Sequence, residues 1–397
     1  MRTDAFFKAV KKWLDLLEKE VRIKIPFQES KQKIFIQLLN VLIFDRILEQ
    51  LGFIKDHSLR RQWDNCEALS FGHDKKKFIL HFFCSHTHIH TFIVPRITLF
   101  HNSFLEKIVD DNKNFEGLYE CLKRIIANIY SSENSLWEGN YLPFTFAEED
   151  IFGKIYEQSI ADEKKKEGIF YTPKFLRKVL IENTLVKKLL TLQDEILSLL
   201  QLHSSDFTKY HSNKMKKLID YLISIKIVDP ACGSGSFLID IIPIIWNTYG
   251  KLITQIDAIL TRIREDRAKE PLKGEKSLKY LTCIKSRDLL IPNQRNRIII
   301  IILRHIYGKE RDEVALQLTK INIWLTALKL VSEAFNASEI KNKRRFITFL
   351  PELETNIVKG NALIGVNYSE FLEFKGKKIN FFYNTQDTII FNLPCFF

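Results

Sequence analysis

The spacing of apolar residues changes character once along the chain. In the first part, apolar residues recur every three or four positions, which is typical of helices with one buried face. This spacing predicts four helices, over residues 3–20, 28–51, 115–130 and 148–160. The stretches 78–83 and 91–100 are instead rich in β-prone residues and predict short strands. Residues 1–160 are therefore expected to form a mainly α-helical domain with a small β patch.

Beyond a charged segment at 161–168 (ADEKKKEG), which is expected to be a solvated linker, short β-prone runs alternate with helical patterns. Strands are predicted at 225–229, 306–310, 356–360 and 387–391. Helices are predicted at 174–190, 214–223, 236–248, 251–305 and 312–334. An alternation of this kind is typical of a parallel, doubly wound sheet. The sequence therefore predicts an α/β domain over residues 161–397.

Composition narrows the class of protein. The chain has 397 residues, enough for two or three domains, and a formal net charge of +12, which favours a polyanionic partner. Its six cysteines are scattered without pairing or CxxC spacing, and no signal peptide is recognised, which together indicate reduced thiols in the cytoplasm. Since no apolar run reaches the length of roughly 18 residues that a membrane span needs, no membrane contact is expected. We therefore expect a cytoplasmic protein.

The stretch KIVDPACGSGSFL at 226–238 contains a glycine-rich turn between a strand and a helix. Asp229 closes the predicted strand, and Gly233 and Gly235 can adopt positive φ without a Cβ that would block a ligand. The next helix starts near Ser236, so its free N–H groups face the turn. The spacing matches neither GxGxxG nor GxxxxGK[ST], and a glycine turn of this kind, taken alone, is more often structural than ligand-binding.

The turn and the segments around it together resemble gamma-type adenine-specific DNA methyltransferases, such as type I modification subunits and fused type IIG restriction–modification enzymes. DPACGSGSFL resembles their S-adenosylmethionine loop, and GIFYTPKFLRKVLIENTL (168–185) the segment above the cofactor. HIYGKERDEVALQLTKINIWL (305–325) and LPELETNIVKGNALIG (350–365) resemble the next two strands and their turns. EEDIFGKIYEQSI (148–160) resembles their lead-in helix. The resemblance implies a Rossmann-like class I methyltransferase sheet.

The resemblance also implies which residues bind S-adenosylmethionine. Asp229 would accept from its ammonium group, and the backbone of Ala231, Cys232, Gly233 and Gly235 would approach its methionine part. Glu310 would accept the ribose hydroxyls, with the nearby Asp312 as an alternative that could instead cap a helix.

Three further residues are implied to contact the cofactor. Asn361 would bind the adenine edge through its amide, unless it only forms the turn after a strand. Phe170 and Thr172 would line the cofactor from above, although Thr-Pro also suits the start of a helix.

The catalytic loop of the resembling enzymes reads Asn/Asp-Pro-Pro-aromatic, and here DTIIFNLPCFF ends the chain. Asn392 matches the residue that accepts hydrogens from the target amine, Leu393 replaces the first proline and Pro394 matches the second. Phe396 falls one residue after the aromatic position, which Cys395 occupies. The stretch is therefore either a catalytic loop with Asn392, Leu393, Pro394 and Phe396 as its residues, or a degraded end of one.

The resembling enzymes have further strands and a target-recognition domain beyond the four strands predicted here. We expect either a second polypeptide that supplies them or a truncated, inactive form. The implied function is transfer of methyl from S-adenosylmethionine to the exocyclic amine of adenine in double-stranded DNA, within restriction–modification. Two alternatives remain: a non-catalytic subunit that binds cofactor or DNA and needs a partner chain, and a methyltransferase acting on protein or RNA.

The histidine-rich stretch at 81–90 is a second candidate site. Alternation would place His86, His88 and His90 on one strand face, where they could hold zinc. Structural zinc spacings are absent, so an exposed polar strand face is the preferred interpretation and no metal is predicted.

Overall fold

The computed structural model describes twelve stretches of the chain: residues 2–22, 31–51, 53–55, 57–69, 72–84, 102–130, 151–159, 172–200, 209–269, 294–331, 350–360 and 388–390. The chain divides into two compact units, residues 1–170 with 335–352 and residues 171–334 with 353–397. The domain boundary predicted at residue 160 falls outside the described residues and stays a prediction.

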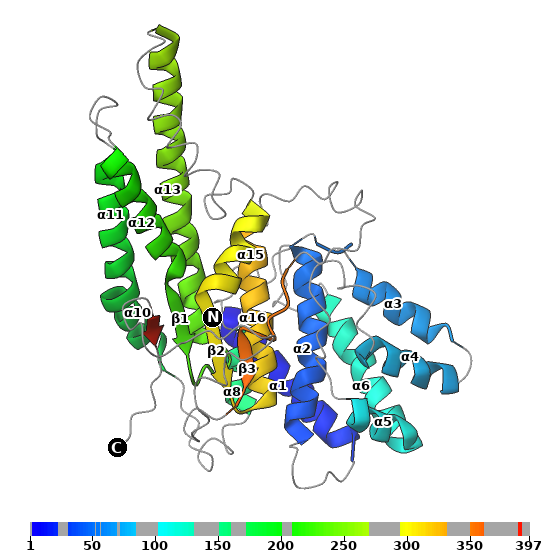
Figure 1. The fold of residues 1–397 in the computed structure, drawn as a ribbon. Helices are drawn as coiled ribbons and strands as arrows, with labels where there is room; N and C mark the ends of the chain where they lie inside the picture. The colour runs from blue at the N-terminus through cyan, green and yellow to red at the C-terminus, as the bar shows by residue number, and fades with distance from the viewer. Residues whose placement is uncertain are drawn as a thin grey trace, which may run out of the picture. The chain divides into compact units, whose positions relative to one another are not determined.

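The first unit is built from helices (Figure 1). They are α1 (Arg2–Glu20), α2 (Lys31–Gln50), α3 (Ser58–Glu67), α4 (Gly72–Cys84), α5 (Asn102–Asp110), α6 (Asn112–Tyr130) and α8 (Ile151–Ser159). The four helices predicted from apolar spacing in this part of the chain are confirmed. Helix α2 is buried on nearly all sides, since α1, α3 and α8 pack around it, and it forms the centre of the unit's core.

The strand predicted at 78–83 is wrong, because these residues lie in helix α4. Ile79, Phe82 and Phe83 are buried while His81 is exposed, which is the three-and-four spacing of one helix face. The helical spacing was missed because these side chains are β-prone. The packing of α4 against α3 and α5 overrides that propensity. The second predicted strand, at 91–100, lies outside the described residues.

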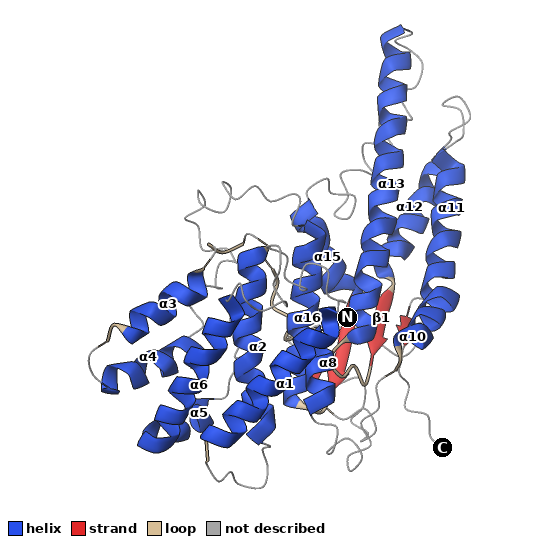
Figure 2. Ribbon diagram, turned by 180° about the vertical axis from the view of Figure 1, so that it is seen from behind, coloured by secondary structure: helices blue, strands red, loops and turns tan. Residues whose placement is uncertain are grey.

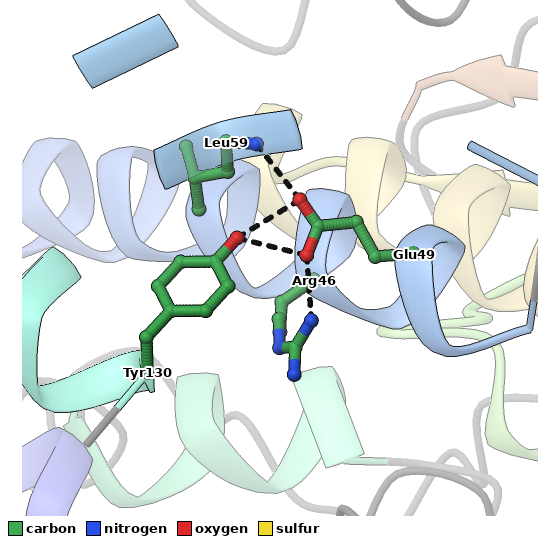
Figure 3. Close-up of polar contacts among 4 residues, drawn as sticks. All are labelled: Arg46, Glu49, Leu59 and Tyr130. Carbon is green, nitrogen blue, oxygen red and sulfur yellow. Dashed lines mark hydrogen bonds and ion pairs between the residues drawn. The ribbon is translucent and has the colours of Figure 1, made fainter. Parts of the chain in front are cut away.

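A buried carboxylate joins three helices of the first unit (Figure 3). Glu49 on α2 accepts hydrogen bonds from the backbone N–H of Leu59 at 2.7 Å and from the Tyr130 hydroxyl at 2.8 and 2.9 Å. It also pairs with the Arg46 guanidinium at 2.6 Å, which lies over the Tyr130 ring. Burial, then the charge of Glu49, raises the pKa of the Tyr130 phenol, which therefore stays protonated and keeps donating. The network connects α2, α3 and α6.

The second unit contains the sheet and the longest helix (Figures 1 and 2). Its helices are α10 (Lys174–Ile181), the π-helical turn η1 (Glu182–Val186), α11 (Lys187–Leu200), α12 (Lys209–Ser224), α13 (Ser236–Lys269), α15 (Gln294–His305) and α16 (Glu313–Val331). Its strands are β1 (Lys226–Asp229), β2 (Ile306–Glu310), β3 (Ile357–Lys359) and β4 (Thr388–Ile390). Helix α11 packs against both α12 and α13.

The four described strands form one sheet in the order β3-β2-β1-β4, and every neighbouring pair is parallel. Each lies where a β-prone run predicts it, so the predicted α/β class with a parallel sheet is confirmed. Since parallel strands share their carboxyl edge, the ends of all four strands lie on the same side of the sheet.

Helix α16 is the only helix among the described residues that is long and apolar enough to cross a membrane by those two criteria. Of its most apolar window, 78% is buried inside the protein, where it packs against β2, β3, α13 and α15. A core helix surrounded on all sides passes the same test, so this helix is weak evidence for a membrane span.

His305, at the end of α15, contacts α13 and the residue before β1 in the core of the second unit. Its Nδ1 lies 2.6 Å from the carbonyl oxygen of Ile225 and must donate to it, while its Nε2 lies 3.0 Å from the Tyr249 hydroxyl and accepts from it. Burial, which disfavours the charged ring, lowers the pKa of His305 to about 4. The imidazole is therefore neutral in the folded protein near neutral pH.

We expect this histidine to make stability depend on pH. Below the ordinary pKa of 6.5, the unfolded chain binds a proton at His305 that the folded chain does not bind until about pH 4. Stability is therefore lost as pH falls through that window, by about 2 kcal/mol between about pH 7 and about pH 5. Denaturant unfolding of the protein and of a His305→Gln variant measures this, and an equal slope with pH in both would contradict it.

Candidate functional site

The carboxyl edge of the sheet brings together three parts of the predicted motifs, namely Asp229, Glu310 and the glycine-rich turn. Asp229 at the end of β1 pairs in register with Gly308 of β2, and Glu310 at the end of β2 pairs with Lys359 of β3. The turn that follows β1 continues this contact, because the N–H of Cys232 donates to the carbonyl oxygen of Lys309 at 3.0 Å. The glycine-rich turn therefore lies directly beside the end of the second strand.

The turn needs both of its glycines for its shape. Gly233 has φ +55° and Gly235 has φ +87°, in the region that side chains with a Cβ rarely adopt. A Cβ added to Gly235 would also lie 2.9 Å from the Cγ2 of Thr319 on α16. The N–H of Gly235 closes the turn by donating to the carbonyl oxygen of Cys232 at 2.7 Å, and α13 starts at the next residue. The positive φ predicted for both glycines is confirmed.

Glu310 holds the turn and the end of β2 together. Its Oε2 accepts from the N–H of Gly233 at 2.8 Å, and its Oε1 accepts from the N–H groups of Arg311 and Asp312 at 2.7 and 2.9 Å. A carboxylate offers roughly four lone-pair positions, so these three bonds leave acceptor capacity on Oε2. The side chain can therefore accept one further donor beside the turn.

Asp312, the alternative to Glu310, serves as a helix cap. Its Oδ1 accepts from the N–H of Ala315 at 2.9 Å, and its carbonyl oxygen accepts from the N–H of Leu316 at 2.9 Å. This is the arrangement of a residue at the start of a helix, here α16. The bond described from an acid of this pair to the glycine turn is that of Glu310.

Two polar residues of α16 that the sequence motifs do not single out also hold the turn. The Thr319 hydroxyl lies 2.6 Å from the carbonyl oxygen of Gly233, and the Asn322 amide donates to the carbonyl oxygen of Ser234 at 2.8 Å. Both side chains are fully buried. The available signal was two polar residues, three positions apart, on one face of a mainly apolar helix.

The turn presents negative charge from two strand ends. Asp229 is fully buried and its Oδ1 accepts from the N–H of Ala231 at 3.2 Å. Burial, then the charges of Asp229 and Glu310, raises the pKa of the Cys232 thiol well above its ordinary value. The thiol is therefore protonated, and the two acids make the site better suited to a cationic ligand than to a phosphate.

Of Phe170 and Thr172, which are predicted to line the cofactor from above, Thr172 is the one that the structure describes. Its carbonyl oxygen accepts from Arg177 at 2.9 Å, and Pro173 precedes the first residue of α10, as the Thr-Pro helix start predicts. Phe170 and Asn361 lie outside the described residues. So do the predicted catalytic residues Asn392, Leu393, Pro394 and Phe396, although β4 ends two residues before Asn392 with Ile390 paired to Val228.

Within the described residues no group of three or more histidine, cysteine, aspartate or glutamate side chains could hold a metal ion. Of the histidine-rich stretch, His81 lies on helix α4, whereas His86, His88 and His90, which were weighed as a zinc-binding strand face, lie outside the described residues.

Comparisons with known proteins bear on the part of the chain that contains this site. Residues 205–397, which contain the glycine turn, β2 and α16, match the model of the MmeI DNA-methyltransferase domain. The chain is 25% identical over 378 residues to a Methanocaldococcus jannaschii protein named as a candidate type II restriction enzyme and methyltransferase. The match covers 85% of this chain and 28% of that relative, so the chain spans under a third of its length. No solved structure matches the chain with significance. The two matches confirm the predicted resemblance to DNA methyltransferases of restriction–modification systems, and the family match covers residues 205–397.

Proposed function

We propose that this chain binds S-adenosylmethionine at the carboxyl edge of its sheet and transfers the methyl group to adenine in double-stranded DNA. The main observation in support is the Glu310 carboxylate, which accepts a hydrogen bond from the glycine turn and retains capacity to accept another beside it. That capacity suits a ribose hydroxyl, the part of the cofactor that the resembling enzymes bind at this strand end. A Rossmann-like class I methyltransferase sheet is the architecture that the proposal implies.

The residues present fit this cofactor. S-adenosylmethionine supplies a methyl group on a sulfonium and also carries an ammonium group, so acids close to the site favour it. Asp229 and Glu310 provide such acids, whereas both would disfavour the pyrophosphate of a dinucleotide. The backbone of Ala231, Cys232, Gly233 and Gly235 would approach the methionine part, and Thr172 and Phe170 would cover the other side.

The adenine specificity rests on the resemblance of the chain's last residues to the catalytic loop. In that role Asn392 and the carbonyl of Leu393 would accept hydrogens from the target amine, with Pro394 stiffening the loop and Phe396 stacking on a flipped base. Asn361 would bind the adenine of the cofactor. DNA as the substrate is supported by the family match and by the net charge of +12, since a phosphate backbone attracts a basic protein. A cytoplasmic location is the one in which the proposed substrate, DNA, would be available to the protein.

Methyl incorporation tests the proposal directly. The full chain is incubated with labelled S-adenosylmethionine and unmodified double-stranded DNA of mixed sequence, and the digested nucleosides are separated. We expect label in N6-methyladenine. Label in methylcytosine would contradict the adenine specificity, and label in added protein or RNA would favour that alternative class.

A second candidate function is a non-catalytic subunit that needs a partner chain. The observation that favours it is Leu393-Pro394-Cys395, where the resembling enzymes have Pro-Pro-aromatic. Cofactor binding without methyl transfer, followed by transfer when a polypeptide carrying further strands and a recognition domain is added, would support it.

We expect Glu310→Ala to weaken S-adenosylmethionine binding at least tenfold, about 1.4 kcal/mol, because a ribose acceptor and the bond to Gly233 are both lost. Isothermal titration of the folded variant measures this. Glu313→Gln is the matched control, since that nearby carboxylate pairs only with the exposed Lys359 among the ion pairs described here and should leave affinity unchanged. Equal affinity of the two variants for S-adenosylmethionine would show that Glu310 is not part of the site.

A further inference from the structure

Helix α10 follows the Thr-Pro segment directly but has little apolar contact with the rest of its unit. Of its eight residues only Arg177 and Ile181 are buried. The side of the helix that would normally be buried is instead exposed: Phe175, Leu176, Val179 and Leu180 are 43 to 67% exposed. The position of α10 therefore depends strongly on what Arg177 contacts.

Arg177 bonds to two separate parts of the second unit. Its Nε donates to Oδ2 of Asp240 on α13 at 2.8 Å, and its Nη1 donates to the carbonyl oxygen of Thr172 at 2.9 Å. The side chains of Arg177 and Asp240 are only 10% and 15% exposed. A planar guanidinium held in two directions, and shielded from water, fixes both partners more firmly than an exposed ion pair does.

Asp240 links this contact to the glycine turn. It lies on α13 about one turn after Ser236, where the helix begins immediately beyond Gly235. The first residues of α13 therefore follow the glycine turn directly and also include Asp240, the acid that binds Arg177. Arg177 joins the backbone at Thr172 to the rigid element from which the turn emerges.

We propose that Arg177, held by Asp240, is a positioning residue that keeps the Thr172–Pro173 segment in place over the S-adenosylmethionine site. The inference rests on the proposed function, because it takes that cofactor to be the ligand beside the glycine turn. Arg177 acts through Thr172 and through α13, and it makes no contact with the reacting atoms. Loss of the pair releases the segment and with it one wall of the site.

The test is isothermal titration of the full chain with S-adenosylmethionine. We expect Arg177→Met to bind at least tenfold more weakly than the unmodified protein. Lys178→Met is the matched control, because it makes the same change at the next position of α10 and breaks only an exposed pair with Glu182. Circular dichroism without ligand confirms that each variant is folded, and the control should bind with unchanged affinity.

A double-mutant cycle separates positioning from general loss of stability. Asp240→Asn should also weaken binding, and the double variant Arg177→Met with Asp240→Asn should bind no more weakly than Arg177→Met alone, since the two act as one contact. Arg177→Lys keeps the charge without the planar group and should restore affinity only in part. If Arg177→Met does not fold, Arg177→Lys carries the test with an expected loss of several-fold.

The outcomes separate the two proposals. Folded Arg177 variants that bind as tightly as Lys178→Met would overturn the positioning role and leave the proposed function intact. Additive losses in the cycle would also overturn it. An unmodified, folded chain that does not bind S-adenosylmethionine would overturn the proposed function itself.

Discussion

Replacing Gly235 with alanine is expected to weaken S-adenosylmethionine binding by about thirtyfold or more. The backbone at Gly235 has φ +87°, which costs an L-residue about 1–2 kcal/mol. The added Cβ would lie 2.9 Å from Thr319 Cγ2 and 3.2 Å from its Cα, and such crowding adds about 1–3 kcal/mol. The turn would have to move, and its bonds to Glu310 and Thr319 would be lost. Isothermal titration of the folded variant measures the loss.

Two further variants make this prediction specific. Gly250→Ala on α13 is the control, because a Cβ there meets only the end of the Arg297 side chain at 3.7 Å and alanine favours a helix. It should leave binding unchanged and raise the melting temperature slightly. Thr319→Ser added to Gly235→Ala removes the nearest methyl group and should restore part of the affinity. Equal binding by Gly235→Ala and Gly250→Ala would show that the turn does not form the site.

Glu49→Leu is expected to destabilise the first unit by about 3–5 kcal/mol. The substitution leaves the Leu59 N–H, the Tyr130 hydroxyl and the Arg46 guanidinium without the acceptor that they share in the folded protein. The Glu49 side chain is fully buried, so water cannot replace it without opening the packing of α2, α3 and α6. Hydrogen exchange of peptides from α2 and α6 reports this locally.

The part of the chain in which hydrogen exchange changes tests the prediction most directly. Peptides from α16 in the second unit should keep their protection, since the Glu49 network lies in the first unit. Asp64→Asn breaks the exposed 4.0 Å pair with Arg60 and should change stability by less than about 1 kcal/mol. Tyr130→Phe removes one donor and should cost about 1–2 kcal/mol. Unchanged exchange in α2 for Glu49→Leu would mean that the carboxylate is not a structural connection.

Local patterns predicted the sheet because its signals are short and sharply bounded. The runs KIVD (226–229) and IYGKE (306–310) are short β-prone segments, with Pro230 after the first and the helix cap Asp312 two residues after the second. Both form strands within one residue of the prediction. The stretch FILHFF had the same β-prone content, yet it became part of α4. Only packing against α3 and α5 decides between the two forms.

The site was only partly predictable for a related reason. Gly233, Gly235 and Glu310 lie in segments whose order along the chain resembles known motifs, so each could be assigned from its own neighbourhood. Arg177 contacts Asp240, 63 residues later, and no local pattern specifies such a pairing. Polar residues inside an apolar helix, such as Thr319 and Asn322, mark a buried contact but do not identify its partner.

The hydrogen bonds that shape the glycine turn come from residues made much later during synthesis. Glu310, Thr319 and Asn322 lie 77, 86 and 88 residues beyond the turn positions that they contact. While the ribosome is adding these residues, the turn has only its own internal bonds and cannot hold its final shape. A nascent chain released before residue 310 would therefore contain the complete glycine motif but would not form the site. The ability to bind a ligand would appear late in translation, once β2 and α16 have emerged and packed.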